Sequence, residues 1–330
     1  MGSINFSKLF DSFSDLKVGV IGDLMLDTYW WGKVDRISPE APVPIVSVSK
    51  KELRIGGAGN VALNLAAFGA RVDVIGIVGN DSDGEHLLKL LQDKNISTYF
   101  LSESNVRPTT NKIRIISRNQ HMMRLDAEVT QPLNPDEEIE ILRLFEKYLK
   151  QIKPQIVIFE DYNKGVLTPK VITSAIQLCK KNNCLVAVDP KRKNFFCYKG
   201  ADIFKPNLQE AKDSLNIISD QIDEEDLKNI HDKLRKELHH DISFITLSER
   251  GVFYNKEEEW NIIPTHIRKI ADVSGAGDTV IAVASLVYAE TKDVKLMAEV
   301  ANIAGGLVCE EVGTVAINKE KLIEECDLLL

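Results

Sequence analysis

The sequence predicts an α/β fold in which a mostly parallel sheet is covered by helices on both faces. Short apolar segments of strand length alternate with longer segments of helical length along most of the 330 residues. Repeated strand–helix units of this kind place parallel strands between layers of helices. Residues 28–48 and 97–125 break the alternation and are rich in alternating and β-branched residues, so we expect them to form a small β-sheet that acts as a lid.

The expected strands of the main sheet are short apolar runs. They cover residues 18–21, 72–78, 156–159, 185–188, 203–204 and 244–247. The expected helices are longer and follow the strands in turn. They cover residues 58–68, 85–92, 135–151 and 168–180, a helix that begins at Pro206-Asn207, and two long helices after Asp278. Asp23, Asp161 and Asp189 directly follow strand ends, so we expect them to face one crevice at the carboxyl edge of the sheet.

Composition excludes several classes of protein. The net charge of −8 argues against a nucleic-acid partner. No run of 18 apolar residues could span a membrane, and the N-terminus carries no secretory signal. Five cysteines without a C-x-x-C pair argue against a disulfide framework or a zinc site. We therefore expect a cytoplasmic protein with a sizeable core and no membrane partner.

The segment DVSGAGDT, residues 272–279, gives the clearest indication of chemistry. Two glycines one residue apart let backbone N–H groups converge at a helix N-terminus, which binds phosphate or a developing anion. Asp278 lies at the mouth of this site, where the helix dipole would hold it ionised. An anion site beside a base is suited to phosphoryl transfer to an alcohol. A capping aspartate after a glycine turn explains the same residues equally well.

Two further patterns carry weaker indications. Residues 107–124 contain five basic side chains and no acid, which suggests either a small anionic ligand or a solvated strand face. Residues 57–62 match the loose dinucleotide fingerprint G-x-G-x-x-A, but the charged residues 50–54 before it do not form the buried strand that this fingerprint requires. Walker A and protein-kinase signatures are absent. A nicotinamide enzyme is therefore disfavoured.

Six motifs in order resemble the ribokinase/PfkB carbohydrate kinases, and the resemblance covers essentially the whole chain. Residues 272–279 resemble the C-terminal signature of that family. The other matching motifs are Gly56-Gly57-Ala-Gly-Asn60 with Asn64 and Gly69, then Gly22-Asp23, Asp189-Pro190, Lys205-Pro206-Asn207-x-x-Glu210 and Thr246-Leu-Ser-Glu-Arg-Gly251. The resemblance implies one ribokinase-like domain over residues 1–330, a three-layer α/β/α sandwich with a β-sheet lid. It also implies ATP and Mg²⁺ as cofactors, and it allows a monovalent cation as a further one.

Within the family, the chain is most similar to the D-glycero-D-manno-heptose-7-phosphate kinases. The motifs that carry this similarity lie at residues 22–32, 36–44, 109–114, Asn119-Gln120, 124–126, 161–165 and 189–191. The resemblance implies phosphorylation of O1 of the heptose 7-phosphate on the route to ADP-heptose for lipopolysaccharide, by a stand-alone kinase. Departures from the pattern are Asn163 and Arg192 in place of glycine, Lys205 in place of threonine, and Ser274 in place of threonine.

Two alternatives remain open at this point. One is a kinase of the same family that acts on a different sugar or sugar phosphate. The other is a non-catalytic sugar-phosphate sensor, against which Asp278 and the unbroken Gly-Ala-Gly argue.

The resemblance assigns roles around the nucleotide. Asp278 would take the proton of the sugar hydroxyl, and the amides of Gly275, Ala276 and Gly277 would stabilise the transferring group. Asn207 and Glu210 would lie at the Mg²⁺–triphosphate region, with Glu210 reaching the metal through water. A helix capping box explains this pair as an alternative. The residues expected to line the nucleotide are Thr246, Glu249 and Gly251.

Other residues are expected at the sugar. Asp23 and Asn60 suit sugar hydroxyls, and glycines let the backbone approach closely. The expected sugar site comprises Asp23, Asn60, Gly56 and Gly57, with Lys112, Arg114 and Arg124 of the lid at the 7-phosphate and Asp161, Lys164 and Lys191 on the other side. Large apolar lid residues would be exposed in a monomer, so we expect a homodimer formed through the lid. The residues in question are Trp30, Trp31, Ile45 and Ile115.

Overall fold

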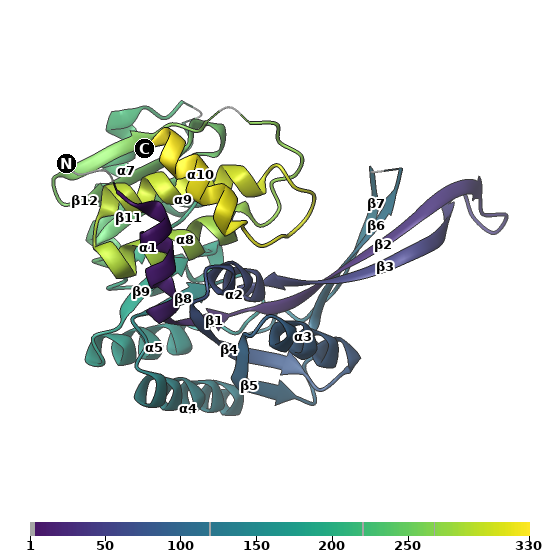
Figure 1. Cartoon of the computed structure of the whole chain (residues 1–330). Helices are drawn as coiled ribbons and strands as arrows, with labels where there is room; N and C mark the ends of the chain where they lie inside the picture. The colour runs from purple at the N-terminus through teal and green to yellow at the C-terminus, as the bar shows by residue number, and fades with distance from the viewer. Residues whose placement is uncertain (1–3, 119, 220, 267) are drawn as a thin grey trace.

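The computed structural model describes residues 4–118, 120–219, 221–266 and 268–330, and its main body has three layers (Figure 1). The middle layer is a nine-stranded sheet in the order β13-β12-β11-β10-β9-β8-β1-β4-β5. Its strands are β1 Lys17–Gly22, β4 Arg71–Gly79, β5 Ser97–Ser104, β8 Ile156–Glu160, β9 Leu185–Asp189, β10 Ile203–Phe204, β11 Ile242–Thr246, β12 Val252–Lys256 and β13 Glu259–Ile263. Neighbouring strands from β11 to β5 are parallel, while β12 and β13 are antiparallel, which confirms the predicted fold class.

Helices cover both faces of this sheet because its strands are apolar on both sides. Val18 and Val20 of β1 belong to one core cluster, and Ile21 belongs to the other. The first face is covered by α1 Phe6–Ser12, α2 Ala58–Ala67, α3 Ser82–Asp93, α8 Ala276–Thr291, α9 Val294–Val308 and α10 Lys319–Leu329. The second face is covered by α4 Pro135–Ile152, α5 Pro169–Lys181, α6 Leu208–Leu215 and α7 Glu224–Leu238.

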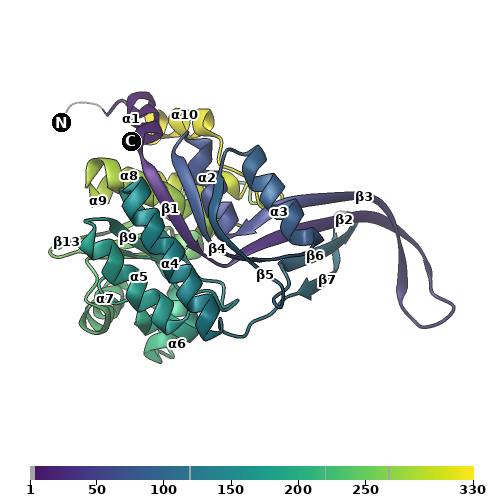
Figure 2. The same cartoon turned by 90° about the horizontal axis from the view of Figure 1, so that it is seen from below.

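The lid is a four-stranded sheet in the order β3-β2-β6-β7. Its strands are β2 Leu24–Ile37, β3 Pro44–Gly57, β6 Thr110–Ser117 and β7 Gln120–Ala127. The β2–β3 ribbon extends well beyond the main body (Figures 1 and 2). Because β2 continues directly from the end of β1 and β3 leads directly into α2, the base of the lid lies at the carboxyl edge of the main sheet.

Several expectations need correction. Residues 97–104 form β5 at the edge of the main sheet, so the lid covers 24–57 and 110–127 rather than 28–48 and 97–125. An edge strand is covered on one side only, so it shows the same alternation as a lid strand. The expectation for residues 50–54 is confirmed, since they lie in β3 but none of them is buried. The sequence patterns also did not reveal α1, α7, α10, β12 or β13.

The apolar lid surface also differs from the expectation. Trp30, Trp31, Ile45 and Ile115 are only half-exposed. The well-exposed apolar side chains of the lid are Ile37, Val43, Val48, Met122, Met123 and Leu125. Among the described helices, none is both long and apolar enough to cross a bilayer.

A buried polar cluster joins α7 to the sheet. The hydroxyl of Ser243 lies 2.8 Å from Nδ1 of His231 and 2.6 Å from Nε2 of His240. Burial lowers the pKa of His231 to about 4 and that of His240 to about 3. Both rings are therefore neutral in the folded protein at neutral pH.

These histidines should make the fold less stable in mild acid. An unfolded histidine takes up its proton near pH 6.5, well above the folded pKa of either ring. The stability that they contribute is therefore complete above that pH and is lost as the pH falls toward the folded pKa values. Each histidine should lower the free energy of unfolding by about 1.4 kcal/mol per pH unit in this window.

Urea unfolding at a series of pH values measures this loss. The matched comparison is the double variant His231→Gln with His240→Gln, whose side chains cannot take up these protons. Its free energy of unfolding should depend less steeply on pH than that of the wild type. Equal pH slopes in the two proteins would contradict the prediction.

Candidate active site

Asp278 lies in the first turn of α8 and is almost completely buried. Its Oδ2 accepts a hydrogen bond from Nδ2 of Asn60 at 2.7 Å, and its Oδ1 accepts one from the hydroxyl of Tyr162 at 2.7 Å. Burial raises the pKa of Asp278 to about 6, although these two hydrogen bonds act to lower it. Burial is thus the largest influence on this pKa, and it acts in the direction opposite to the one expected from the helix dipole. A pKa near 6 leaves the group mostly ionised at neutral pH and suits a general base.

The loop after β8 brings Tyr162 to Asp278. The carboxylate of Asp23, at the end of β1, accepts hydrogen bonds from the amides of Tyr162 at 2.8 Å, Lys164 at 3.0 Å and Val166 at 3.1 Å. In the structure Asp23 therefore holds this loop, whereas we expected it to bind sugar hydroxyls. Sequence reasoning missed Tyr162, although it lies in the motif at residues 161–165 and is the second residue after the end of β8.

One departure from the family pattern is explained by the same loop. Asn163 has a φ of 55°, in the left-handed region that favours glycine. Asparagine is one of the few other residues that adopt this conformation readily. The loop therefore keeps its path with asparagine in place of glycine.

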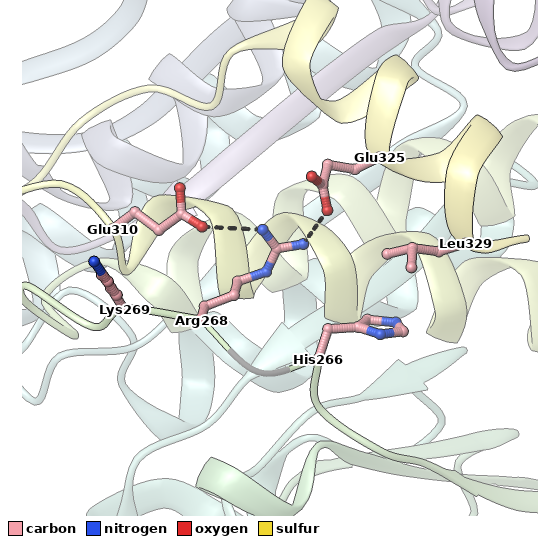
Figure 3. A pocket seen from close by; sticks show the side chains of 6 residues that line it. All are labelled: His266, Arg268, Lys269, Glu310, Glu325 and Leu329. Atoms are coloured by element: carbon pink, nitrogen blue, oxygen red, sulfur yellow. Dashed lines mark hydrogen bonds and ion pairs between the residues drawn. The ribbon is translucent and has the colours of Figure 1, made fainter.

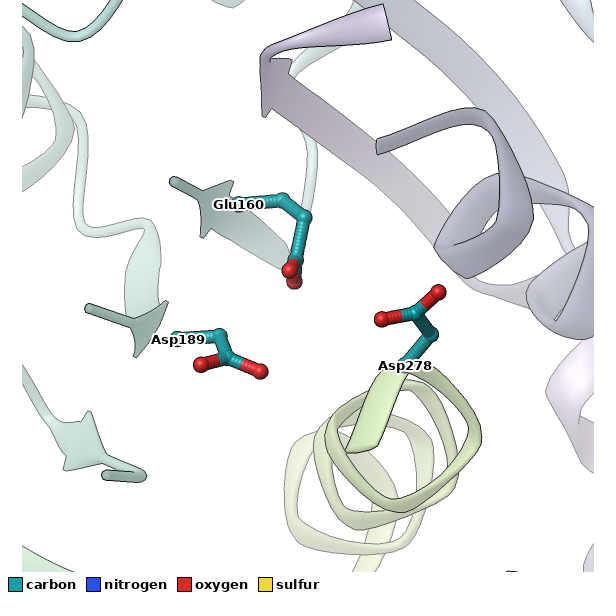
Figure 4. A group of neighbouring side chains, drawn as sticks. All are labelled: Glu160, Asp189 and Asp278. Carbon is teal, nitrogen blue, oxygen red and sulfur yellow. The ribbon is translucent and has the colours of Figure 1, made fainter. Parts of the chain in front are cut away.

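Three carboxyl groups converge at the carboxyl edge of the sheet (Figure 4). Glu160 from β8, Asp189 from β9 and Asp278 each offer an oxygen within 4.8 Å of the others. Burial, then the charges of Asp189 and Asp278, raise the pKa of Glu160 well above its usual range. Among the described residues, neither Glu160 oxygen has a hydrogen-bond partner. Glu160 was not among the predicted site residues, although it directly follows the expected strand 156–159 and so carries the same strand-end signal as Asp161.

Two lysines balance this charge. Nζ of Lys205 lies 2.8 Å from Asp189, and Nζ of Lys191 lies 3.3 Å from Asp189 and 2.8 Å from Glu210. Burial opposes the ionisation of Asp189, but the two lysines hold its pKa below the usual range. Lys205, which replaces the expected threonine, thus stabilises an ionised Asp189.

The predicted anion site lies at the start of α8. Gly275 has a φ of 80°, and a Cβ there would lie 2.7 Å from Nδ2 of Asn60, so glycine is required. The amide of Ala276 donates to the carbonyl of Val273 at 3.3 Å. Among the described hydrogen bonds, the amide of Gly277 has no acceptor, as expected in the first turn of a helix. Of the three predicted amides, that of Ala276 thus already has a partner.

The predicted nucleotide residues lie near the ends of β10 and β11. Asn207 and Glu210 form a capping box. The amide of Glu210 donates to the side chain of Asn207 at 2.8 Å, and the amide of Asn207 donates to the side chain of Glu210 at 2.9 Å. The helix-capping alternative is therefore present in the structure. Asn207 pairs with Thr246 across a β-bridge. Glu249 is exposed in the following turn, and Gly251 closes it with a φ of 95°.

Among the predicted cations, most are already paired. Arg114 lies 2.6 Å from Asp27, Arg124 lies 2.8 Å from Asp126, and Lys164 lies 2.7 Å from Glu128. Lys112 has no acidic partner among the residues that the structure describes. Its Nζ lies 5.6 Å from the centre of the Tyr162 ring, as does that of Lys191. The structure therefore brings Lys112 to the ring of Tyr162, whose hydroxyl donates to Asp278, and leaves Arg124 exposed on the lid.

The remaining predicted sugar residues lie at the base of the lid. A Cβ on Gly56 would lie 2.6 Å from Oδ2 of Asp27, and Gly57 has a φ of 57°. The glycines thus permit close packing of lid strands. Asp161 is buried and accepts a hydrogen bond from the hydroxyl of Tyr198 at 2.8 Å. Asn119 lies outside the described residues.

The lid is also joined to the turn before α8. The guanidinium of Arg54 in β3 donates to the carbonyls of Val312 at 2.9 Å and Thr314 at 3.3 Å. Between them, the amide of Gly313 donates to Asp272 at 2.9 Å, and Asp272 also accepts bonds from Ser274. These contacts lead from the lid to the turn before α8.

An open pocket of about 500 Å³ lies beside α9 and α10 (Figure 3). None of the predicted site residues lines it. The guanidinium of Arg268 lies between Glu310 and Glu325 and pairs with both. This pairing holds the segment before α8 against α10 and the turn that follows α9.

Comparison with known proteins places this site in a family. The model of the pfkB family carbohydrate kinases matches residues 15–321. The chain belongs to this family. It is therefore a carbohydrate kinase, as the motifs predicted.

The curated relatives of this kinase include longer proteins. It is 43% identical over 308 residues to "Bifunctional protein HldE" of a Nitratiruptor species, a match that covers 93% of this chain and 64% of the relative. It is 39% identical to "Bifunctional protein HldE" of Sulfurimonas denitrificans, covering 96% of this chain and 65% of that protein. The chain thus spans just under two thirds of the length of these relatives.

Solved structures share the fold of this PfkB kinase. Phosphofructokinase-2 from Escherichia coli in complex with potassium matches with a TM-score of 0.78, 18% identity and coverage of 94% of this chain and 99% of that one. Arabidopsis thaliana ribokinase complexed with ribose and ATP matches with a TM-score of 0.72, 18% identity and the same coverage. The ribokinase-like sandwich with a second, smaller sheet is therefore confirmed.

Replacing Asp23 by Asn should loosen the loop that carries Tyr162. The amide group of Asn supplies one acceptor oxygen where the carboxylate has two, so at least one loop N–H loses its partner. We expect a loss of about 1–3 kcal/mol in stability and faster hydrogen exchange at the amides of Tyr162, Lys164 and Val166. Asp73→Asn, a buried aspartate outside the loop, is the control. Unchanged exchange at all three amides would assign Asp23 another role.

Proposed function

We propose that this protein transfers the γ-phosphoryl group of ATP to O1 of D-glycero-D-manno-heptose 7-phosphate, giving the 1,7-bisphosphate, a precursor of ADP-heptose and lipopolysaccharide. Residues 1–330 would act as one kinase domain in the cytoplasm. The observation that carries the proposal is the buried carboxylate of Asp278 at the start of α8, with Lys112 nearby as a cation without an acidic partner among the described residues. The motifs shared with heptose-7-phosphate kinases support this choice of sugar.

Each part of the site has a role in this reaction. Asp278 takes the proton of the O1 hydroxyl as that oxygen attacks the γ-phosphorus. The amide of Gly277 and the positive end of α8 face the negative charge of the transferring group. Lys112 binds the 7-phosphate from the lid. Asn60 and Tyr162 orient the carboxylate of Asp278 through their hydrogen bonds.

The acidic residues fit a magnesium ion. Mg²⁺ prefers carboxylate oxygens and retained water, and the two oxygens of Glu160 are buried without a partner among the described residues. Asp189 would hold the ion together with Glu210 acting through water, and a bound Mg²⁺ neutralises phosphate oxygens. A monovalent cation is also part of the proposal, since one solved neighbour is a complex with potassium.

A substrate panel tests the proposal directly. The protein is given ATP and Mg²⁺ with heptose, hexose and pentose phosphates, and phosphorus NMR identifies the position and anomer of the new phosphate. A new phosphate at O1 of the heptose 7-phosphate is the expected result. Faster phosphorylation of a different sugar phosphate would reassign the substrate.

Asp278→Asn should lower turnover by at least ~10²-fold, because the amide cannot accept the hydroxyl proton. Nucleotide affinity, measured by titration, should stay nearly unchanged. The control is Asp293→Asn, since Asp293 caps α9 by accepting a bond from Leu296 and lies outside the site. If Asp278 were only a helix cap, both variants would behave alike.

Lys112→Ala should reduce the preference for heptose 7-phosphate over free heptose. A lost hydrogen bond to a charged group costs about 1.5–3 kcal/mol, which corresponds to roughly a 10- to 100-fold smaller ratio of kcat/KM values. Arg114→Ala should change the ratio less because Arg114 is paired with Asp27, and Arg124→Ala is the exposed control. If Lys112→Ala leaves the ratio unchanged, the phosphate binds elsewhere.

We also propose a homodimer formed through the lid. The exposed apolar side chains of β7 and of the β2–β3 ribbon would be covered by a second lid about a two-fold axis. Light scattering should give twice the chain mass of 37.0 kDa. Met123→Glu with Leu125→Glu should yield monomers, whereas the same pair of changes at Ile139 and Leu328, exposed outside the lid, should not. A dimer that persists in the lid variant would place the interface elsewhere.

A further inference from the structure

The phenol of Tyr162 makes the same kind of contact with Asp278 that an acceptor hydroxyl must make. Its O–H donates to Oδ1 of Asp278 at 2.7 Å while Asn60 donates to Oδ2. Both oxygens of the carboxylate therefore already accept a hydrogen bond before any sugar arrives.

The position of this phenol is built into the fold. The backbone amide of Tyr162 donates to the buried carboxylate of Asp23, so the residue starts from a fixed point at the end of β8. The ring lies 5.6 Å from the ammonium of Lys112 on the lid and 5.6 Å from that of Lys191 on the main body. Cations at this distance attract the face of an aromatic ring. The phenol is thus held from both the lid and the main body.

We propose that Tyr162 excludes water from Asp278 until the sugar arrives, and that the acceptor hydroxyl of the sugar then replaces the phenol at Oδ1. This inference rests on the proposed role of Asp278 as the general base. It assigns Tyr162 to acceptor selection, because water and a sugar hydroxyl are both O–H groups that the base could activate.

The reaction that Tyr162 would suppress is the hydrolysis of ATP. In that reaction a water oxygen bonds to the γ-phosphorus, the bond from phosphorus to the bridging oxygen of ADP breaks, and one water proton passes to Asp278. The products are ADP and inorganic phosphate. Each event consumes ATP without phosphorylating a sugar, so a kinase benefits from keeping water off its base.

The test measures phosphate release from ATP and Mg²⁺ by the full chain without any sugar. Tyr162→Phe removes only the hydroxyl, and we expect sugar-independent hydrolysis to rise by roughly tenfold, less than the roughly 10²- to 10⁴-fold that a fully positioned general base contributes, because nothing in the described part of the site orients the water. Tyr162→Leu is made in parallel so that the test survives if one variant does not fold. The control is Tyr198→Phe, which removes a phenol bonded at 2.8 Å to Asp161 rather than to Asp278 and should leave hydrolysis unchanged.

The outcomes of this assay test the role of Tyr162 independently of which sugar is the substrate. The inference is supported if ATP hydrolysis rises in the Tyr162 variants and the rise disappears when Asp278→Asn is added. If Tyr162 only stabilised the fold, its replacement would not increase the rate of hydrolysis. No rise in either Tyr162 variant, or a rise that persists with Asp278→Asn, would overturn it. The hydrolysis assay contains no sugar, so its result does not depend on which sugar the substrate panel identifies.

Discussion

The buried carboxylate of Asp23 is the contact on which the geometry of the site depends. It lies where β1 ends and accepts three backbone amides of the loop that follows β8. Burial raises the pKa of Asp23, and the three amides act in the opposite direction. A carboxylate that satisfies three loop donors is costly to remove, because each donor would remain buried without an acceptor. The loop therefore presents Tyr162 and Lys164 at fixed positions.

At the carboxyl edge of the sheet, the negative charges of a carboxyl cluster are balanced by lysines that lie beside it. Glu160, Asp189 and Asp278 lie close together, and Lys191 and Lys205 compensate them. Burial raises the pKa of Glu160 and Asp278, whereas the two lysines keep that of Asp189 low. These neighbouring carboxyl groups thus differ in their readiness to hold a proton, which is a frequent property of active sites.

The lid and the main body meet through polar contacts on two sides of this centre. On one side, Arg54 of β3 donates to the loop at residues 312–314, which Asp272 ties to the turn before α8. On the other side, Lys112 of β6 approaches the ring of Tyr162. A ligand that draws the lid toward the sheet would therefore act on both the start of α8 and Asp278. These polar contacts add to the apolar packing of Leu24, Leu26 and Ile55 at the base of the lid, which belong to the same core cluster as β1 and α2.

By itself, the sequence determined the alternation of strands and helices, the family and the location of Asp278 at a helix start, because these features depend on local patterns of apolar residues and glycines. It did not reveal that 97–104 joins the main sheet, because edge strands and lid strands share one pattern. Only the tertiary structure decided the partners of the polar side chains. Asp23 binds loop amides, Arg114 pairs with Asp27, and Tyr162 reaches Asp278 across 116 residues of sequence. Such pairings depend on which strand ends become neighbours in space, and no local pattern of residues encodes that.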